Sequence, residues 1–329
     1  MADLKTYIEQ FANLRRANAR QGFYSDATRK KAPHKPILLL AVLDLIASEV
    51  ITNPVVDVTG DLVELNDLFN LYWRRVVPLG QTSSIAFPFS RLHNEPFWKL
   101  IVRPGHTVSD AVVAKTTTVS YLRTYALGAQ IDEQLFAIMQ TEPGRTSLRK
   151  SLLQACFSEE AQQALREQAL VNQGAFDYER LLEQQAHQPL VKEVLESNNY
   201  KPAVRDQGFR KVVTTSYDHR CALCGIRIVT PEGHTVVEAA HIVPWCESRN
   251  DDIRNGMALC RLCHWGFDEG MLGVSGSYQV ITASSIGLTP NFAGPLQTLT
   301  GRAIIPPQET ALWPAQEYLS EHRHRWKLK

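Results

Sequence analysis

The sequence predicts an α+β fold in three parts: a mixed α/β region at residues 1–105, a helical connecting region at 106–198, and a C-terminal region at 199–329. Three observations support this division. Helical and strand-like patterns alternate over the first hundred residues, the composition between 110 and 197 is rich in Gln, Glu, Ala and Leu, and two C-x-x-C pairs frame a β-branched stretch after residue 220. A chain of 329 residues is too long for one ordinary core and about right for two domains.

Three segments of the first region are predicted to be helical. Apolar residues recur at helical spacing in Leu4–Arg20 and again in Leu62–Val77. Between them, Ile37–Ala47 is continuously apolar apart from Asp44. This run is too short to span a bilayer, and its length favours a buried helix over a strand.

Strands are predicted in the same region. Val55–Val58 is short and β-branched, and Ile85–Leu92 and Phe97–Val102 are rich in aromatic residues. The turn-forming residues 93–96 separate the last two segments. We therefore expect a sheet packed against the three helices.

The charge pattern gives a weak indication of nucleic-acid binding. The formal net charge is only +1, so no overall positive field draws in nucleic acid, but Arg15–Lys35, Lys201–Arg227 and Arg323–Lys329 are locally basic. Each of these runs alone is as readily a solvated surface. The first ten residues lack the apolar core of a signal peptide, and we expect a cytoplasmic protein that does not bind membranes.

Four of the six cysteines form two pairs that predict a metal site. Cys221 and Cys224 make the first pair, Cys260 and Cys263 make the second, and 35 residues lie between them. In a cytoplasmic protein this spacing favours a closed, tetrahedral Zn²⁺ site with a structural role over disulfide bonds.

The residues between and after these pairs form a constellation. Val236–Pro244 has the β-branched content of a strand and carries His241, Asn255 follows in a loop region, and His264 comes directly after the second pair. The order strand-His, loop-Asn, helix-His, together with zinc knuckles, resembles the HNH nuclease family over about Tyr217–Leu272. The resemblance implies a ββα-metal fold and cleavage of DNA.

Hydrolysis of a phosphodiester requires deprotonation of water and positive charge on the phosphate. A neutral imidazole can take the proton near pH 7. The resemblance implies that His241 is the general base, that His264 binds a catalytic Mg²⁺ or Mn²⁺ ion, and that Asn255 orients the loop and the base. Many HNH proteins place a metal ligand directly before the base, where this chain has Ala240.

Two carboxylates are candidates for the missing metal ligand. Strand alternation places Glu238 on the face of Ala240, and Asp268 lies four residues after His264 on an expected helix. Arg205 and Arg210, in a helix-like segment before the first cysteine pair, are either phosphate contacts or ordinary surface residues. Because one HNH site cuts one strand, a double-strand break implies a homodimer.

The first region resembles, in two segments, the sulfur-binding domain of phosphorothioate-dependent restriction endonucleases, which precedes an HNH nuclease. The segments are residues 33–40 and 87–92 followed by Phe97 and Trp98. Sulfur is larger and less hydrated than oxygen, so an apolar pocket beside cations favours it. The candidate residues of this pocket are an apolar wall of Phe87, Pro88 and Phe89 with Lys35, Arg91, His34 or His93 around it. Alternatively, Phe87 and Phe89 are inward-facing residues of a strand.

The sequence therefore predicts a modification-dependent restriction endonuclease that cleaves double-stranded DNA near a mark, with phosphorothioate favoured. Alternatives are a reader of methylated or hydroxymethylated cytosine, an HNH nuclease triggered by sequence or a partner, and a non-catalytic zinc-dependent DNA-binding protein. A reader of a flipped cytosine needs a deep aromatic pocket. Tyr72, Trp73 and Trp98 are the candidates for it.

Overall fold

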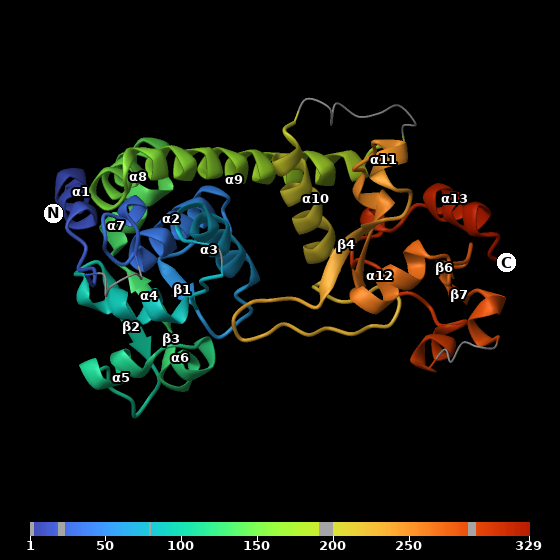
Figure 1. The fold of residues 1–329 in the computed structure, drawn as a ribbon, viewed down its shortest axis with the longest axis horizontal. Helices are drawn as coiled ribbons and strands as arrows, with labels where there is room; N and C mark the ends of the chain where they lie inside the picture. Colours follow the sequence, from blue (N-terminus) through green and yellow to red (C-terminus); the bar gives the residue numbers. More distant parts are fainter. Residues whose placement is uncertain (1–2, 19–23, 79, 191–199, 289–293) are drawn as a thin grey trace. The chain divides into compact units, whose positions relative to one another are not determined.

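The chain folds into two compact units, which are described separately. The structure is a computed structural model that describes residues 3–18, 24–78, 80–190, 200–288 and 294–329 (Figure 1). The first unit comprises Met1–Gln173 and Thr230–His234, and the second comprises Gly174–Val229 and Thr235–Lys329. The boundary between the units falls within the long helix α9 (Glu159–Ala186). The division into three functional domains at 1–105, 106–198 and 199–329 stays a prediction. No helix among the described residues is both long and apolar enough to cross a bilayer.

The centre of the first unit is the helix α2 (His34–Ala47). Every side chain from His34 to Ile46 is buried, which confirms the buried helix predicted from the apolar run that begins at Ile37. Helix α3 (Val63–Val76) packs beside it and confirms the second helical prediction. Helix α1 (Leu4–Ala12) is shorter than the predicted segment, which ends at Arg20.

The sheet of the first unit has three antiparallel strands in the order β1-β3-β2. They are β1 (Val55–Asp57), β2 (Trp98–Val102) and β3 (Ala126–Ile131), so β3 is the central strand. Gly128 permits the close pairing, because a Cβ there would lie 2.5 Å from the carbonyl oxygen of Val56. The prediction of a helical region at 106–198 is thus wrong at β3, whose small and apolar residues complete the sheet.

The prediction of a strand at Ile85–Leu92 is also wrong. This segment contains the helix α4 (Ala86–Arg91), followed by a 3-10 turn at Leu92–Asn94. Pro88 lies in the first helical turn, where its missing N–H leaves no helical hydrogen bond unmade. Burial of Phe89 against Trp98 overrides the strand propensity of the aromatic residues.

Four helices of the first unit share a buried polar network centred on Asp44 of α2. The Asp44 carboxylate accepts hydrogen bonds from the Tyr72 hydroxyl at 2.6 Å, the Arg149 guanidinium at 2.6 Å and the Asn172 amide at 2.7 Å. These partners lie on α3, on α8 (Glu142–Cys156) and on α9. The paired charges satisfy a carboxylate that would otherwise be costly to bury. The remaining helices of this unit are α5 (Asp110–Lys115), α6 (Val119–Tyr125) and α7 (Glu133–Gln140), and a 3-10 turn spans Asp26–Thr28.

The core of the second unit contains two antiparallel strands followed by a helix. Strand β4 (Val237–His241) pairs with β5 (Gly256–Cys260), and the helix α12 (Arg261–Asp268) begins directly after β5. Helix α10 (Pro202–Ser216) packs against both strands. Gly256 permits this close packing, because a Cβ at that position would lie 2.6 Å from the Val213 side chain of α10.

Further short elements complete the second unit. A hairpin of β6 (Leu272–Val274) and β7 (Val280–Thr282) follows α12, and the C-terminal helix α13 (Gln316–Trp326) packs against β6. The loop after β4 contains α11 (Trp245–Ser248) and a 3-10 turn at Ile253–Asn255. Other 3-10 turns lie at Ser284–Gly287, Gly294–Leu299 and Thr310–Leu312.

Candidate active site

Four thiols converge at the point where the loop after α10 meets the end of β5. The sulfur atoms of Cys221, Cys224, Cys260 and Cys263 all lie within 4.8 Å of one another, and the Cys224 and Cys260 sulfurs are 3.7 Å apart. Four thiolates around one tetrahedral Zn²⁺, at a Zn–S distance of about 2.3 Å, are separated by about 3.8 Å. The cluster therefore fits a closed, structural Zn²⁺ site.

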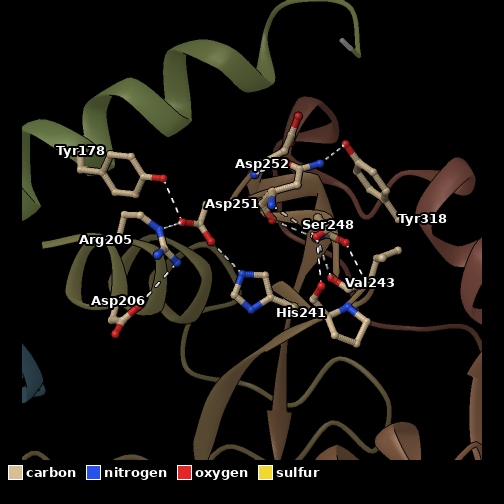
Figure 2. A network of polar contacts seen from close by, with 12 residues as sticks. Tyr178, Arg205, Asp206, His241, Val243, Ser248, Asp251, Asp252 and Tyr318 are labelled. Carbon is tan, nitrogen blue, oxygen red and sulfur yellow. Dashed lines mark hydrogen bonds and ion pairs between the residues drawn. The ribbon is translucent and has the colours of Figure 1, made fainter. Parts of the chain in front are cut away.

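A histidine and a buried carboxylate face each other at the end of β4. His241 Nε2 lies 2.9 Å from Asp251 Oδ1, and the other oxygen of Asp251 accepts from Arg205 Nε at 2.5 Å and from the Tyr178 hydroxyl at 3.0 Å (Figure 2). Asp251 is only 1% exposed. Burial alone would raise the pKa of its carboxyl, but the hydrogen bonds from His241 and Arg205 and their charges hold that pKa below its ordinary value.

His241 lies in the wall of a cleft in the second unit. Its imidazole stacks on the Phe209 ring of α10, with centroids 3.9 Å apart and planes 6° apart, and its side chain is 22% exposed. The cleft has a volume of ≈ 520 Å³. Its lining combines cationic, acidic and apolar side chains: Arg205, Asp206, Phe209, Arg210, Thr235, Val237, Glu238, Ala239, His241, Asp251 and Arg261.

Both candidate carboxylates lie beside His264 of α12. Glu238 Oε2 is 3.3 Å from His264 Nδ1, and Asp268 Oδ2 is 3.4 Å from His264 Nε2. The two carboxylates thus lie at opposite nitrogens of the ring, and of the two only Glu238 lines the cleft. Ala240, directly before His241, is buried, whereas Glu238 is exposed on β4.

Asn255 holds the loop that follows β4. It is fully buried, its amide donates to the carbonyl oxygens of Val243 at 3.1 Å and Asn250 at 3.0 Å, and its Oδ1 accepts from the Val243 N–H at 2.9 Å. Asn250 in turn donates to the Tyr318 hydroxyl of α13 at 2.8 Å. These bonds fix the two ends of the loop that carries Asp251.

Residues 221–275 match the HNH endonuclease family. The matched segment, named the HNH domain below, contains all four clustered cysteines together with His241, Asn255 and His264.

The similarity to whole proteins is limited. No curated protein matches the chain. Among solved structures, the chain is similar to one described as "Modification dependent TagI restriction endonuclease", with 25% identity and a TM-score of 0.28. The match covers 37% of this chain and 38% of that chain, so it spans less than two thirds of that protein.

The two arginines predicted as phosphate contacts lie on α10, directly before the HNH domain, and they differ in burial. Arg205 is 6% exposed, pairs with Asp251, and stacks on the Trp245 ring at 3.8 Å. Arg210 is an exposed residue of the cleft lining. Both arginines line the cleft, and Arg210 is the more exposed of the two.

Three predicted pocket residues of the first unit come together. His34 lies between Trp73 and Phe87, at 4.7 Å from each ring, and the Arg91 guanidinium lies 3.7 Å above the Phe87 ring. Burial, and secondarily the charge of Arg91, lowers the pKa of His34 to about 4, so this histidine is neutral at pH 7. Phe87 and Arg91 are partly exposed.

Three other predicted pocket residues lie in the core instead of at a surface. Lys35 is buried and pairs with the buried carboxylate of Glu95 at 2.5 Å. Pro88 and Phe89 face inward on α4, because that segment is helical and buries this side. His93 lies half-buried in the turn after α4.

The sequence reasoning did not single out Asp251, Phe209 or Tyr178. The sequence did contain an indication of Asp251, which lies in an Asn-Asp-Asp run between His241 and Asn255. Phe209 and Tyr178 lie on α10 and α9, outside the motif, and only the packing of these helices brings them to the site.

Proposed function

We propose that this chain hydrolyses phosphodiester bonds in double-stranded DNA, with His241 of the HNH domain as the general base. The observation that carries the proposal is the placement of His241 in the wall of a cleft of ≈ 520 Å³ that also contains Glu238, Arg210 and Arg261. A neutral imidazole in this position accepts a proton from water near pH 7. The two arginines supply positive charge for the phosphate.

Glu238 and His264 are the proposed ligands of the catalytic cation. A carboxylate oxygen and an imidazole nitrogen 3.3 Å apart, with the carboxylate in the cleft, are suited to share one ion. Bound Mg²⁺ or Mn²⁺ supplies Lewis-acid stabilisation of the charge on the phosphate and the leaving oxygen. Asp268 lies at the other ring nitrogen and is proposed to orient His264.

This assignment predicts different effects for the two carboxylates. Replacing Glu238 by Ala is expected to raise the Mn²⁺ or Mg²⁺ concentration for half-maximal cleavage at least about tenfold, because a ligand is lost. The Asp268→Ala variant should raise it by less than Glu238→Ala does, because Asp268 holds His264 in place but is not itself a ligand. Cleavage rates over a series of metal concentrations provide the measurement. A larger effect at Asp268 would reverse the assignment.

We further propose that residues 1–105 read a DNA mark, and that the mark is a phosphorothioate. Support comes from the partly exposed pair of Phe87 and Arg91 beside the neutral His34, an apolar face next to a cation. Such a surface favours a weakly hydrated sulfur while the cation holds the backbone charge. The three aromatic candidates for a flipped-cytosine pocket lie in the core instead: Tyr72, Trp73 and Trp98.

The test is cleavage of one plasmid in three forms: unmodified, phosphorothioated and cytosine-methylated, with Mg²⁺ or Mn²⁺ present. We expect cutting only of the phosphorothioated form. Cutting of only the methylated form would contradict the proposal that the mark is a phosphorothioate, but it would support the proposal that the chain hydrolyses DNA. Equal cutting of all three forms would show that residues 1–105 do not restrict cleavage, and binding without any cutting would contradict the nuclease.

Double-strand cleavage is proposed to require a homodimer. Each HNH domain contains one His241 and cuts one strand at a time. Cleavage that rises with the square of protein concentration at low concentration supports two cooperating chains. A first-order dependence with nicked circles as the only product would contradict the dimer.

A further inference from the structure

The carboxylate of Asp251 forms a hydrogen bond with Nε2 of His241, the candidate base (Figure 2). We propose that Asp251 is the positioning residue of His241: it holds the imidazole in the Nε2–H tautomer and leaves Nδ1 as the basic atom. The inference rests on the proposed nuclease function. Within the described part of the chain, Nδ1 has no hydrogen-bond partner, and the side chain is accessible from the cleft.

The tautomer follows from the charge of the carboxyl group. The second oxygen of Asp251 accepts from the Arg205 guanidinium and from the Tyr178 hydroxyl, two donors that favour the ionised form. An ionised carboxylate can only accept hydrogen bonds. His241 Nε2 must therefore carry the hydrogen of the 2.9 Å contact with Oδ1, and in the neutral ring Nδ1 keeps its lone pair.

Aromatic packing fixes the plane of the same ring. His241 stacks on Phe209 with 6° between the planes, so the ring cannot turn out of its hydrogen bond without losing this contact. Arg205 is itself held between Asp251 and the Trp245 ring, which lies 3.8 Å from its guanidinium carbon. The base is thus oriented before substrate arrives, which removes an entropic cost from the reaction.

The carboxylate also acts when the proton moves. His241 gains a positive charge as it accepts a proton at Nδ1, and the adjacent negative charge of Asp251 stabilises that imidazolium. The charge of Arg205 balances Asp251 in the resting state, so the buried carboxylate remains ionised without a proton of its own.

Replacement of Asp251 by Asn tests the tautomer directly. Arg205 and Tyr178 both donate to Oδ2 of the carboxylate, so the amide that replaces it must present its oxygen to them and its NH₂ group to His241. The Asp251→Asn variant therefore presents a hydrogen-bond donor to His241. The imidazole can keep this hydrogen bond only if Nε2 is the acceptor. Nδ1 then carries the hydrogen and can no longer accept one from water.

Asp252 provides a matched control. It is adjacent in sequence, also buried and also paired with an arginine, but its partner is Arg254 at 2.6 Å and, among the described residues, it has no hydrogen bond to His241. Loss of a buried arginine pair in the loop is thus common to both variants. Only the Asp251 variant removes the contact with the imidazole.

The first measurement is single-turnover cleavage of phosphorothioated duplex DNA, with the 329-residue chain in saturating excess over the DNA. We expect Asp251→Asn to lower the rate about 10²- to 10⁴-fold with little change in DNA affinity, because the proton acceptor is in the wrong tautomer. The Asp252→Asn variant should retain the rate within about tenfold. Equal losses in both variants, with loss of bound zinc, would show that Asp251 is only structural and would overturn the proposal.

The second measurement does not depend on activity. Ring-¹⁵N-labelled histidine distinguishes the two tautomers by NMR, and the His241 signals are assigned by their absence from the His241→Ala spectrum. We expect the Nε2–H form in the wild type and in Asp252→Asn, and the Nδ1–H form in Asp251→Asn. An unchanged tautomer in Asp251→Asn would overturn the proposal even if the wild type cleaves DNA. A wild type that shows the expected tautomers but cuts no DNA would contradict the proposed function instead.

Discussion

We expect the His241→Ala variant to bind DNA like the wild type and to cleave it about 10²- to 10⁴-fold more slowly, the usual contribution of a general base. The imidazole lies in the cleft wall, stacked on Phe209 and hydrogen-bonded to Asp251, and no other histidine of the described residues lines that cleft. Single-turnover cleavage with Mg²⁺ or Mn²⁺ measures the rate, and a gel-shift titration measures the affinity.

The control for this prediction is His187→Ala. His187 belongs to the same unit, is half-exposed and pairs with the exposed Glu309 at 3.2 Å, so its loss should leave the cleavage rate unchanged. If His241→Ala cut DNA at the wild-type rate, another group would have to be the base. A binding protein without catalytic activity would show no cleavage in any variant.

The second large effect is expected at the cysteine cluster. The Cys263→Ser variant should lose its bound zinc and the cooperative unfolding of the second unit, because structural Zn²⁺ contributes on the order of 10–16 kcal/mol of apparent binding free energy to folding. Cys263 is buried where α12 begins, so one lost ligand disturbs the link between β5 and the helix that carries His264. Zinc content and thermal unfolding are the measurements.

Cys246→Ser is the matched control for the cluster. Cys246 belongs to the same unit but is exposed and lies outside the group of four sulfurs, so its replacement should leave zinc content and unfolding unchanged. Extraction of the wild type with a strong chelator should reproduce the effect of Cys263→Ser. One tightly bound zinc ion per chain in Cys263→Ser would contradict a four-thiolate site.

The motif of the candidate active site could be predicted because its parts are close in the sequence. The two cysteine pairs, the strand that ends in His241, and the positions of Asn255 and His264 follow from local spacing, and residues 221–275 match the HNH endonuclease family. The buried helix α2 was equally predictable, since a continuous apolar run of that length is longer than an ordinary strand and favours a buried helix.

Where local and tertiary preferences conflict, the tertiary structure decided. Ile85–Leu92 has the aromatic content of a strand but forms α4, because the core buries Phe89 on one side of a helix. Strand β3 lies in a region of helical composition, and only the presence of β1 and β2 on its two sides makes it a strand.

The sequence by itself determined the two cysteine pairs, the order of the HNH residues and the choice of His241 as the candidate base. Only the tertiary structure decided what surrounds that base. Tyr178 of α9 and Arg205 of α10 meet Asp251 although they lie 73 and 46 residues away from it. The physical reason is that spacing along the chain encodes the face of a strand or helix, whereas a hydrogen bond between distant helices and a loop depends on how the whole unit packs.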